Sequence, residues 1–394
     1  MASFLDHLIS RRRFLQASAL LALSTTLPAR FAFASLPGDQ RLIVVILRGA
    51  LDGLGAVIPY RDPHYMDARG SIATPLSADA LIDLNGYFAF PKALEALVPL
   101  YTAKELLVLH ATATPYRERS HFDAQDVLEN GGATPHGLST GWLNRTLGAL
   151  GGSAQALALG PDIPLILRGG GNVTSWDPSP LPEVDADFLS RVAHMYEHDP
   201  VLSHALSQST LMQQLVGTEA EPKNARSFPN MMAQAAKLMA APTGPRLATI
   251  DVTGWDTHVN QGTDKGRLPN NLRILADGLN SLRTGLGAAW ANTAVLVVTE
   301  FGRTVRGNGT NGTDHGTGTV AFLLGGNVAG GRVIGDWPGL ATLYQDRDLT
   351  PANDLRALLK GTLAGHLAVN QQVLDQTIFP ESASATAYSG LFKA

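Results

Sequence analysis

Short apolar runs without polar alternation constrain the fold of this chain more than any other feature. Ala294–Val298 (AVLVV) and Arg41–Leu47 (RLIVVIL) are the clearest of these runs, and Leu106–Leu109 is a third. A strand that is apolar on both faces is typical of a parallel sheet covered by helices on both sides. Amphipathic patterns such as Leu272–Trp290 separate the runs. We therefore expect an α/β fold with a mostly parallel central sheet flanked by helices on both faces.

Polar side chains follow each of the main predicted strands. They are Asp52 after Arg41–Leu47, Ser120 and His121 after Leu106–Leu109, Asp256 and His258 after Arg246–Val252, and Glu300, Asp314 and His315 after Ala294–Val298. The carboxyl ends of parallel strands meet at one edge of a sheet, where open α/β sheets bind their ligands. Carboxylate and imidazole groups from several strands are thus expected to converge on one or two divalent ions.

The same loops carry residues suited to ester chemistry. Ser120 stands at the expected start of a helix, where a nearby metal and the helix N-terminus would favour its deprotonated form. Arg119 or Arg303 could hold an oxygen of a phosphate or sulfate group by a forked contact. These positions are the expected catalytic residues.

Each of these residues also has a purely structural interpretation. Asp52 in Leu-Asp-Gly is also a common turn residue, and Ser120 is also a good helix N-cap. Glu300 at a buried strand end needs a partner, which Arg303 could supply as an ion pair. His194 and His198 have the i,i+4 spacing of metal ligands, but an exposed helix face explains them better.

The N-terminus has the pattern of an export signal. Arg11, Arg12 and Arg13 precede the apolar run Ala17–Leu27, and Ala32-Phe33-Ala34 is an A-x-A cleavage site. We expect a twin-arginine signal peptide over residues 1–34, cleavage near Ala34 and a periplasmic or otherwise exported protein. The twin-arginine export machinery is then a partner, and the apolar run is too short for a permanent membrane span.

Charge and cysteine content exclude several classes of function. Residues 1–34 contain four arginines and one aspartate, so their removal changes the formal net charge from −4 to −7. No basic cluster is present either, and we therefore expect no nucleic-acid partner. The chain has no cysteine, which excludes thiolate metal sites and thiol catalysis. We expect residues 35–394 to form a single α/β domain with a helical insertion around 185–241.

Several segments together resemble a known family. They are the leader, LRGALDGLGAVIPY, SHFDAQDVLENG, GWDTHVNQ, and TEFGRT followed by DHGTGTVAFLLGG. As a set they are similar to the domain-of-unknown-function 1501 family of twin-arginine-exported bacterial proteins. That family is grouped with the alkaline phosphatase/sulfatase-like superfamily. The resemblance implies that superfamily's α/β fold and a metal-assisted site for phosphate or sulfate esters.

The resemblance also implies roles for individual residues. Asp52 matches the metal aspartate after the first strand, and Ser120 matches the nucleophile. Asp256 and His258 resemble the central metal pair, Glu300 the acid of the next strand, and His315 the late metal histidine, with Asp314 as a further ligand. Phe301 stands where the phosphatases have a histidine, so Asp314 or His121 would have to replace that ligand.

These observations predict an exported, metal-dependent hydrolase of phosphate or sulfate esters that acts on a small anionic substrate. The ion would be zinc, manganese, magnesium or calcium, with one or two bound. The alternative is a non-catalytic periplasmic binding or assembly protein on the same fold, with a degenerate site.

Overall fold

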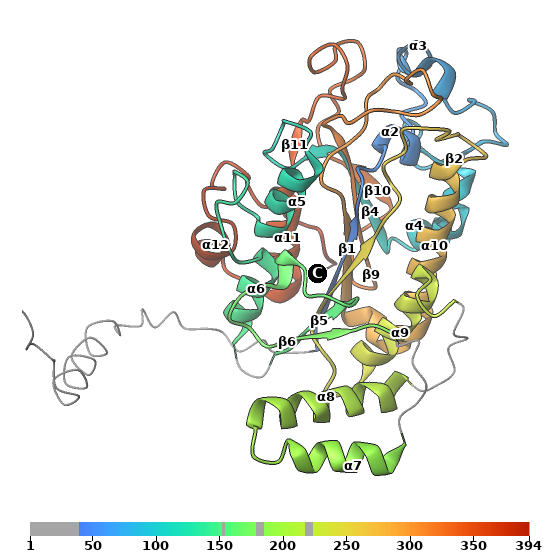
Figure 1. Cartoon of the computed structure of the whole chain (residues 1–394). Coiled ribbons are helices and arrows are strands. Elements are labelled where there is room, and N and C mark those ends of the chain that lie inside the picture. The colour runs from blue at the N-terminus through green and yellow to red at the C-terminus, as the bar shows by residue number, and fades with distance from the viewer. Residues whose placement is uncertain (1–38, 152–153, 179–184, 217–223, 394) are drawn as a thin grey trace, which may run out of the picture. The chain divides into compact units, whose positions relative to one another are not determined.

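A large mixed sheet forms the centre of the computed structural model, which describes residues 39–151, 154–178, 185–216 and 224–393 (Figure 1). The strand order is β10-β4-β9-β8-β1-β7-β5-β6, with β11 paired to β4. The strands are β1 (Arg41–Leu47), β4 (Leu106–Ala113), β5 (Ala156–Leu159), β6 (Val173–Trp176), β7 (Leu247–Val252), β8 (Thr293–Val298), β9 (Thr319–Gly325), β10 (Arg332–Ile334) and β11 (Asn353–Asp354), and a separate pair is formed by β2 (Leu81–Asp83) and β3 (Ala89–Pro91). The predicted export signal lies outside the described residues.

Most of the sheet is parallel. β1 pairs in parallel with both β7 and β8, and among the described strands of this sheet only β9 runs antiparallel to its neighbours, β4 and β8. The predicted strand at Arg41–Leu47 is confirmed with these bounds. The fold-class prediction is therefore confirmed: the sheet is mixed, mostly parallel and flanked by helices.

Helices cover both faces of the sheet because β1 is buried at every position. Its odd-numbered residues from Ile43 to Leu47 join a core cluster with side chains of α9 and α10. Its even-numbered residues from Leu42 to Ile46 join a second cluster with side chains of α5, α6 and α11. Figure 1 shows these two sets of helices on opposite sides of the sheet. The helices are α2 (Gly53–Ala56), α3 (Tyr65–Arg69), α4 (Val98–Thr102), α5 (His121–Asn130), α6 (Trp142–Leu150), α7 (Ala186–Met195), α8 (Pro200–Val216), α9 (Phe228–Ala240), α10 (Arg267–Leu286), α11 (Leu355–Leu367) and α12 (Gln371–Val373).

The stretch expected to be a helical insertion has two different parts. Helix α9 belongs to the sheet-covering layer, since Met232, Ala235 and Met239 are buried in the cluster shared with α10. In α7, by contrast, Phe188 and Met195 are 54% and 77% exposed. Helix α7 therefore has the exposed character expected of an insertion, whereas α9 does not. Among the described helices, none is both long and apolar enough to span a bilayer.

The topology brings several loops to one edge of the sheet. Because β1, β4, β7 and β8 run in the same direction, the segments that follow them all emerge at the same edge. The loop between β8 and β9 begins and ends at that edge, since β9 is antiparallel to β8. The polar residues after these strands therefore share one region.

Strand β4 carries a fully buried histidine that stabilises the core beside this edge. His110 Nε2 donates a hydrogen bond of 2.8 Å to the Val57 carbonyl, and the ring stacks on Phe88 with centroids 5.1 Å apart. Burial lowers the pKa of His110 to about 4. This histidine is neutral in the folded chain at ordinary pH.

We expect His110 to make the fold acid-sensitive. Between pH 6.5 and about 4 the unfolded chain binds a proton at His110 that the folded chain does not, so stability is lost as the pH falls through this window. Between pH 7.5 and 5 the loss should be about 2 kcal/mol. Urea unfolding of His110→Gln should show a smaller pH dependence by that amount, whereas the exposed control His64→Gln should match the native chain. Equal pH dependence in His110→Gln and native protein would contradict this account.

Candidate metal centre

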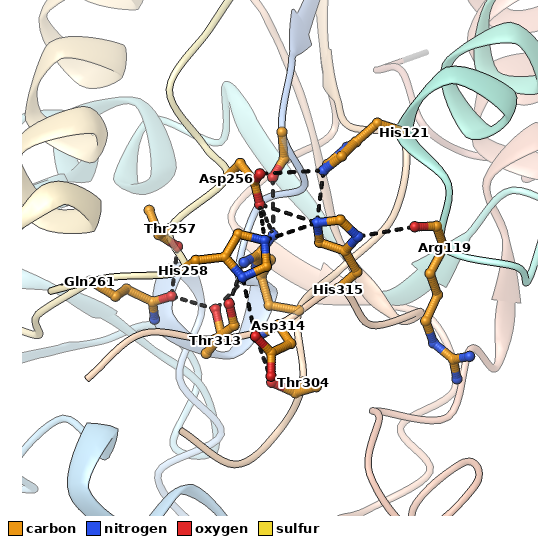
Figure 2. A network of polar contacts seen from close by, with 12 residues as sticks. Arg119, His121, Asp256, Thr257, His258, Gln261, Thr304, Thr313, Asp314 and His315 are labelled. Atoms are coloured by element: carbon orange, nitrogen blue, oxygen red, sulfur yellow. Dashed lines mark hydrogen bonds and ion pairs between the residues drawn. The ribbon is translucent and has the colours of Figure 1, made fainter. Parts of the chain in front are cut away.

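Three histidine side chains meet at the carboxyl edge of the sheet (Figure 2). His121 is the first residue of α5, His258 lies in the loop after β7, and His315 lies in the loop between β8 and β9. His315 Nε2 lies 3.0 Å from His121 Nε2 and 3.0 Å from His258 Nε2. Three histidines that are far apart in the sequence thus bring their Nε2 atoms close together.

The carboxylate of Asp256 completes the group. Its Oδ1 lies 3.0 Å from His258 Nε2 and 3.3 Å from His315 Nε2, and its Oδ2 lies 3.7 Å from His121 Nε2. One ligand atom each from His121, Asp256 and His315 lies within 4.8 Å of the others. The three histidines and Asp256, called the histidine–aspartate cluster below, are only partly buried, with the Asp256 side chain 41% exposed.

The other ring nitrogen of each histidine has its own acceptor. His121 Nδ1 lies 2.8 Å from Glu300 Oε1, and His258 Nδ1 lies 3.1 Å from Asp314 Oδ1. His315 Nδ1 lies 3.0 Å from the carbonyl oxygen of Arg119. Since a carboxylate and a carbonyl only accept, each Nδ1 carries the proton and donates it.

These partners assign the tautomer of all three rings. With the proton on Nδ1, a neutral imidazole presents its Nε2 lone pair, and the three lone pairs face one another and the Asp256 carboxylate. Such a set of donors repels itself unless a cation lies among them. Histidines that bind a metal typically donate their other N–H to a carboxylate or a carbonyl, as these three do.

The spacing of the donor atoms fits a bound ion. A zinc-type ion about 2.0–2.1 Å from two ligands in tetrahedral geometry separates them by roughly 3.3 Å. The nitrogen and oxygen atoms of the histidine–aspartate cluster are separated by 3.0 to 3.7 Å in the contacts given above. The residues present therefore fit a single divalent ion.

Glu300 orients His121. It is fully buried, and its Oε1 accepts hydrogen bonds from Gly49 N (2.8 Å) and Gln125 Nε2 (3.0 Å) in addition to His121. Burial acts to raise the pKa of Glu300, but the hydrogen bonds from His121 and Gln125 outweigh it, and the pKa lies below its usual value. The hydrogen bond to Glu300 in turn raises the pKa of His121, which burial opposes.

Arg303 holds the Asp256 carboxylate. The buried guanidinium places Nη1 2.5 Å from Asp256 Oδ1, while its Nε donates to Thr313 Oγ1 at 3.0 Å and its Nη2 to the Thr313 carbonyl. Desolvation acts to raise the pKa of Asp256, but the hydrogen bond and charge of Arg303 keep that pKa below its usual value. Arg303 thus positions a cluster residue and has its donors engaged within the protein.

Asp52 lies outside the histidine–aspartate cluster in a neighbouring buried network. Its Oδ2 accepts from Arg69 Nη2 at 2.5 Å and from Gln261 Nε2 at 2.6 Å. Gln261 Oε1 in turn accepts from Thr257 Oγ1 (2.7 Å) and Thr313 Oγ1 (2.6 Å). Asp52 therefore supports the loops that carry the cluster, through a chain that ends at the threonine bonded to Arg303.

Arg119 and Ser120 precede His121 in the chain. The Arg119 side chain points away from the imidazoles in Figure 2 and forms an ion pair of 2.7 Å with Asp348, so its carbonyl is what reaches His315. The left-handed backbone at Arg119 (φ 63°) is uncommon for a non-glycine residue. Ser120 is the N-cap residue of α5 but makes no side-chain capping hydrogen bond, and its side chain lies against Tyr116.

Two glycines permit the close approach of the loops. At Gly49, where φ is +118°, a Cβ atom would lie 2.4 Å from the backbone nitrogen of Asp256. At Gly312 a Cβ would lie 2.1 Å from the carbonyl oxygen of His258. Side chains at these positions would push apart the loops that carry Asp256 and His258.

The sequence-derived candidates thus occupy different places. Asp256, His258 and His315 come together with His121. Asp314 and Arg303 hold His258 and Asp256 in position, Glu300 holds His121, and Asp52 contacts none of the four in the hydrogen bonds above. From the sequence, His121 was expected as a ligand only if it replaced the histidine that is absent at position 301, where Phe301 stands. The available signal was Ser-His at the start of a helix after a strand. Phe301 packs on the His121 ring, with centroids 4.8 Å apart.

We expect the Asp52–Arg69 pair to contribute strongly to stability. Both side chains are almost fully buried, at 2% and 1% exposed, so Asp52→Ala leaves the Arg69 guanidinium without its charge partner. Breaking a buried pair on one side costs about 3–5 kcal/mol. Chemical unfolding of Asp52→Ala should show a loss of this size, and the exposed control Asp187→Ala should not. A loss below about 1 kcal/mol in Asp52→Ala would contradict a structural role.

Comparison with solved structures gives distant similarities. The zinc complex of the C-terminal periplasmic domain of EcEptC from Escherichia coli aligns over 88% of each chain, with 12% identity and a TM-score of 0.41. Ps i-CgsB in complex with k-i-k-neocarrahexaose aligns over 89% of this chain and 77% of its own, with 11% identity and a TM-score of 0.43. Murine ectonucleotide pyrophosphatase/phosphodiesterase 5, in an inactive form with AMP, aligns over 67% and 57%, with 13% identity and a TM-score of 0.30. At these TM-scores the comparisons add nothing to the strand order and register described above.

Comparison at the level of sequence places the chain in a family. No curated protein matches it. A family described as a protein of unknown function, DUF1501, matches residues 103–378 and so includes α5, β7, β8 and β9 and all four residues of the histidine–aspartate cluster. Because the match spans more than half of the sequence, the chain belongs to this family of proteins of unknown function.

Proposed function

We propose that this chain is a metal-dependent hydrolase of phosphate or sulfate esters that holds one divalent ion in the histidine–aspartate cluster. One observation carries the metal assignment. All three imidazoles donate from Nδ1 to a fixed acceptor, so that three Nε2 lone pairs and one carboxylate face a common point. A metal ion at that point relieves the repulsion among these donors and uses all four at once.

The chemistry of the donors favours a transition metal. Three imidazoles and one carboxylate suit zinc, iron or copper better than magnesium or calcium, which prefer oxygen ligands. Among the metals expected from the sequence, we therefore propose zinc. When bound, such an ion polarises an ester oxygen or lowers the pKa of a bound water.

A single ion fits the surroundings better than two. The aspartate expected for a second ion, Asp52, already accepts from the Arg69 guanidinium and the Gln261 amide. The position at which the related phosphatases have a histidine holds Phe301, whose ring lies against His121. A guanidinium and an aromatic ring thus occupy places where a second ion would need ligands.

The protein residues have distinct proposed roles. Glu300, Asp314 and the Arg119 carbonyl orient the imidazoles, and Arg303 orients Asp256. Ser120 is the proposed nucleophile, because its hydroxyl precedes a cluster residue and does not cap its own helix. Its Oγ would form a bond to phosphorus or sulfur while the ester bond breaks, the hydroxyl proton leaving with the alcohol. Water would then cleave the seryl ester and restore Ser120.

We also propose that the chain is exported and that its substrate is a small anion. The twin-arginine pattern at Arg11–Arg13 and the A-x-A site at Ala32–Ala34 support export by the twin-arginine machinery to the periplasm. That pathway carries folded proteins, so the ion would be inserted before export. The proposed substrate is a small anionic ester, and the negative net charge argues against nucleic acid.

A second candidate function is a metal-binding protein without hydrolase activity. It is favoured by Arg69, which engages the aspartate, Asp52, that would otherwise be free for a second ion. This candidate predicts the same metal content and no turnover, so the two are separated by activity alone.

Metal content tests the proposed centre. Purified full-length protein should contain about one equivalent of a divalent transition metal by inductively coupled plasma mass spectrometry. His315→Ala and His121→Ala should lose most of it, because each removes one of four ligands. His194→Ala, an exposed histidine on α7, should retain the metal, as should Asp52→Asn. Metal-free native protein that takes up no zinc or manganese on incubation would rule out the centre.

Turnover tests the hydrolase assignment. The metal-loaded chain should hydrolyse aryl phosphates or aryl sulfates, and His315→Ala should reduce kcat/KM by a factor of at least about 100. If Ser120 is the nucleophile, Ser120→Ala should abolish turnover while metal content stays unchanged. Activity that survives in Ser120→Ala would instead assign the attack to water. No turnover by a fully metal-loaded native chain with either ester class would favour the non-catalytic candidate.

A further inference from the structure

A small pocket lies beside the histidine–aspartate cluster. Its volume is about 250 Å³, and its lining includes Arg306, Asn308, Asp314, Asp346 and Arg347. None of the four cluster residues lines it. The pocket is therefore a separate recess next to the candidate metal centre, and a group bound in it would not itself be a metal ligand.

Two contacts tie this pocket to the histidines. Asp314 Oδ1 accepts from His258 Nδ1 at 3.1 Å and from Asn308 Nδ2 at 3.0 Å. Arg347 Nη2 donates to the carbonyl oxygen of His315 at 2.6 Å. The walls of the pocket are thus the same groups that position two of the three imidazoles.

The pocket has basic groups with unused donors. The Arg306 side chain is exposed and makes no hydrogen bond or ion pair with any residue that the structure describes. Arg347 Nε forms an ion pair of 3.1 Å with Asp348 Oδ1 and its Nη2 donates to the His315 carbonyl, while its Nη1 makes no hydrogen bond with the described residues. The guanidinium of an exposed arginine stays hydrated until an anion binds. Its planar arrangement of N–H donors suits the oxygens of phosphate, sulfate or carboxylate groups.

Two carboxylates also line the pocket, and they differ in their partners. Asp314 Oδ1 accepts hydrogen bonds from His258 Nδ1 and Asn308 Nδ2, so this carboxylate has partners within the protein. Asp346 is exposed at the rim, and its carboxylate makes no hydrogen bond with the described residues. An anion inside the pocket would meet the guanidinium groups of Arg306 and Arg347, and it would also face the carboxylates of Asp314 and Asp346.

We propose that this pocket binds a second anionic group of the substrate, with Arg306 and Arg347 as its main contacts. The inference rests on the proposed function and narrows it: the preferred ester carries a phosphate, sulfate or carboxylate group in addition to the one that reacts. Arg306 is the specificity-determining residue, because its side chain has no structural partner among the described residues. Arg347 also positions His315, so its replacement would disturb the cluster as well.

Matched ligands test the pocket without requiring turnover. Isothermal titration calorimetry on the zinc-loaded full-length chain would compare propyl phosphate with alkane bisphosphates that have two-, three- and four-carbon spacers. The best bisphosphate should bind about tenfold more tightly than propyl phosphate, and Arg306→Ala should remove that difference. Propyl phosphate itself should bind Arg306→Ala within about twofold of the native chain. Arg273→Ala, an exposed arginine on α10, is the control and should leave both ligands unchanged.

The outcomes separate this inference from the hydrolase proposal. If no bisphosphate binds more tightly than propyl phosphate, or if Arg306→Ala weakens both ligands equally, the second anion site is wrong even if the chain hydrolyses esters. If the bisphosphate preference depends on Arg306 but no ester is turned over, the site stands as a binding site and the hydrolase assignment fails. Metal content measured after each titration excludes removal of the ion by the bisphosphate as a cause.

Discussion

The orientation of three imidazole rings is the constraint on which the candidate site depends. A histidine ring can turn and can carry its proton on either nitrogen, so three histidines in one place do not by themselves make a binding site. Here Glu300, Asp314 and the Arg119 carbonyl each accept from one Nδ1 and thereby fix both the ring and the tautomer. The resulting set of lone pairs is preorganised, which lowers the reorganisation needed when a cation binds.

Pairing of charges explains how the carboxylates around the candidate site are stabilised and why we propose one ion and not two. Each buried carboxylate has a specific partner: Glu300 has donors from His121 and Gln125, and Asp52 has Arg69. Unpaired, such charges would cost several kcal/mol each. The partly exposed Asp256 is paired with Arg303 and also keeps an oxygen directed at the imidazoles. Arg69 therefore pairs with a carboxylate that supports the loops, Asp52, and Arg303 pairs with the carboxylate that faces the proposed ion, Asp256.

The sequence predicted the architecture more fully than it predicted the contacts of the candidate site residues. Apolar runs buried on both faces and polar residues at strand ends were sufficient for a parallel sheet with a site at one edge, because both follow from local pattern and strand direction. The role of Asp52 depended instead on Arg69, a residue in α3 that no pattern connects to it, and Arg69 engages its carboxylate. The family resemblance assigned the role of nucleophile to Ser120, and His121, next to it, was expected only as a replacement ligand. Long-range hydrogen bonds such as His121 to Glu300, 179 positions apart, have no signature in a single sequence.

The most direct test of the central claim is the coordination of the ion itself. X-ray absorption spectroscopy at the edge of the metal found in the purified chain reports ligand type, number and distance. The account predicts three imidazole nitrogens and one carboxylate oxygen at about 2.0–2.1 Å, with a water oxygen as any fifth ligand and with no metal–metal scattering. A shell of oxygen ligands without imidazole scattering, or a second metal about 3.5–4 Å away, would contradict it.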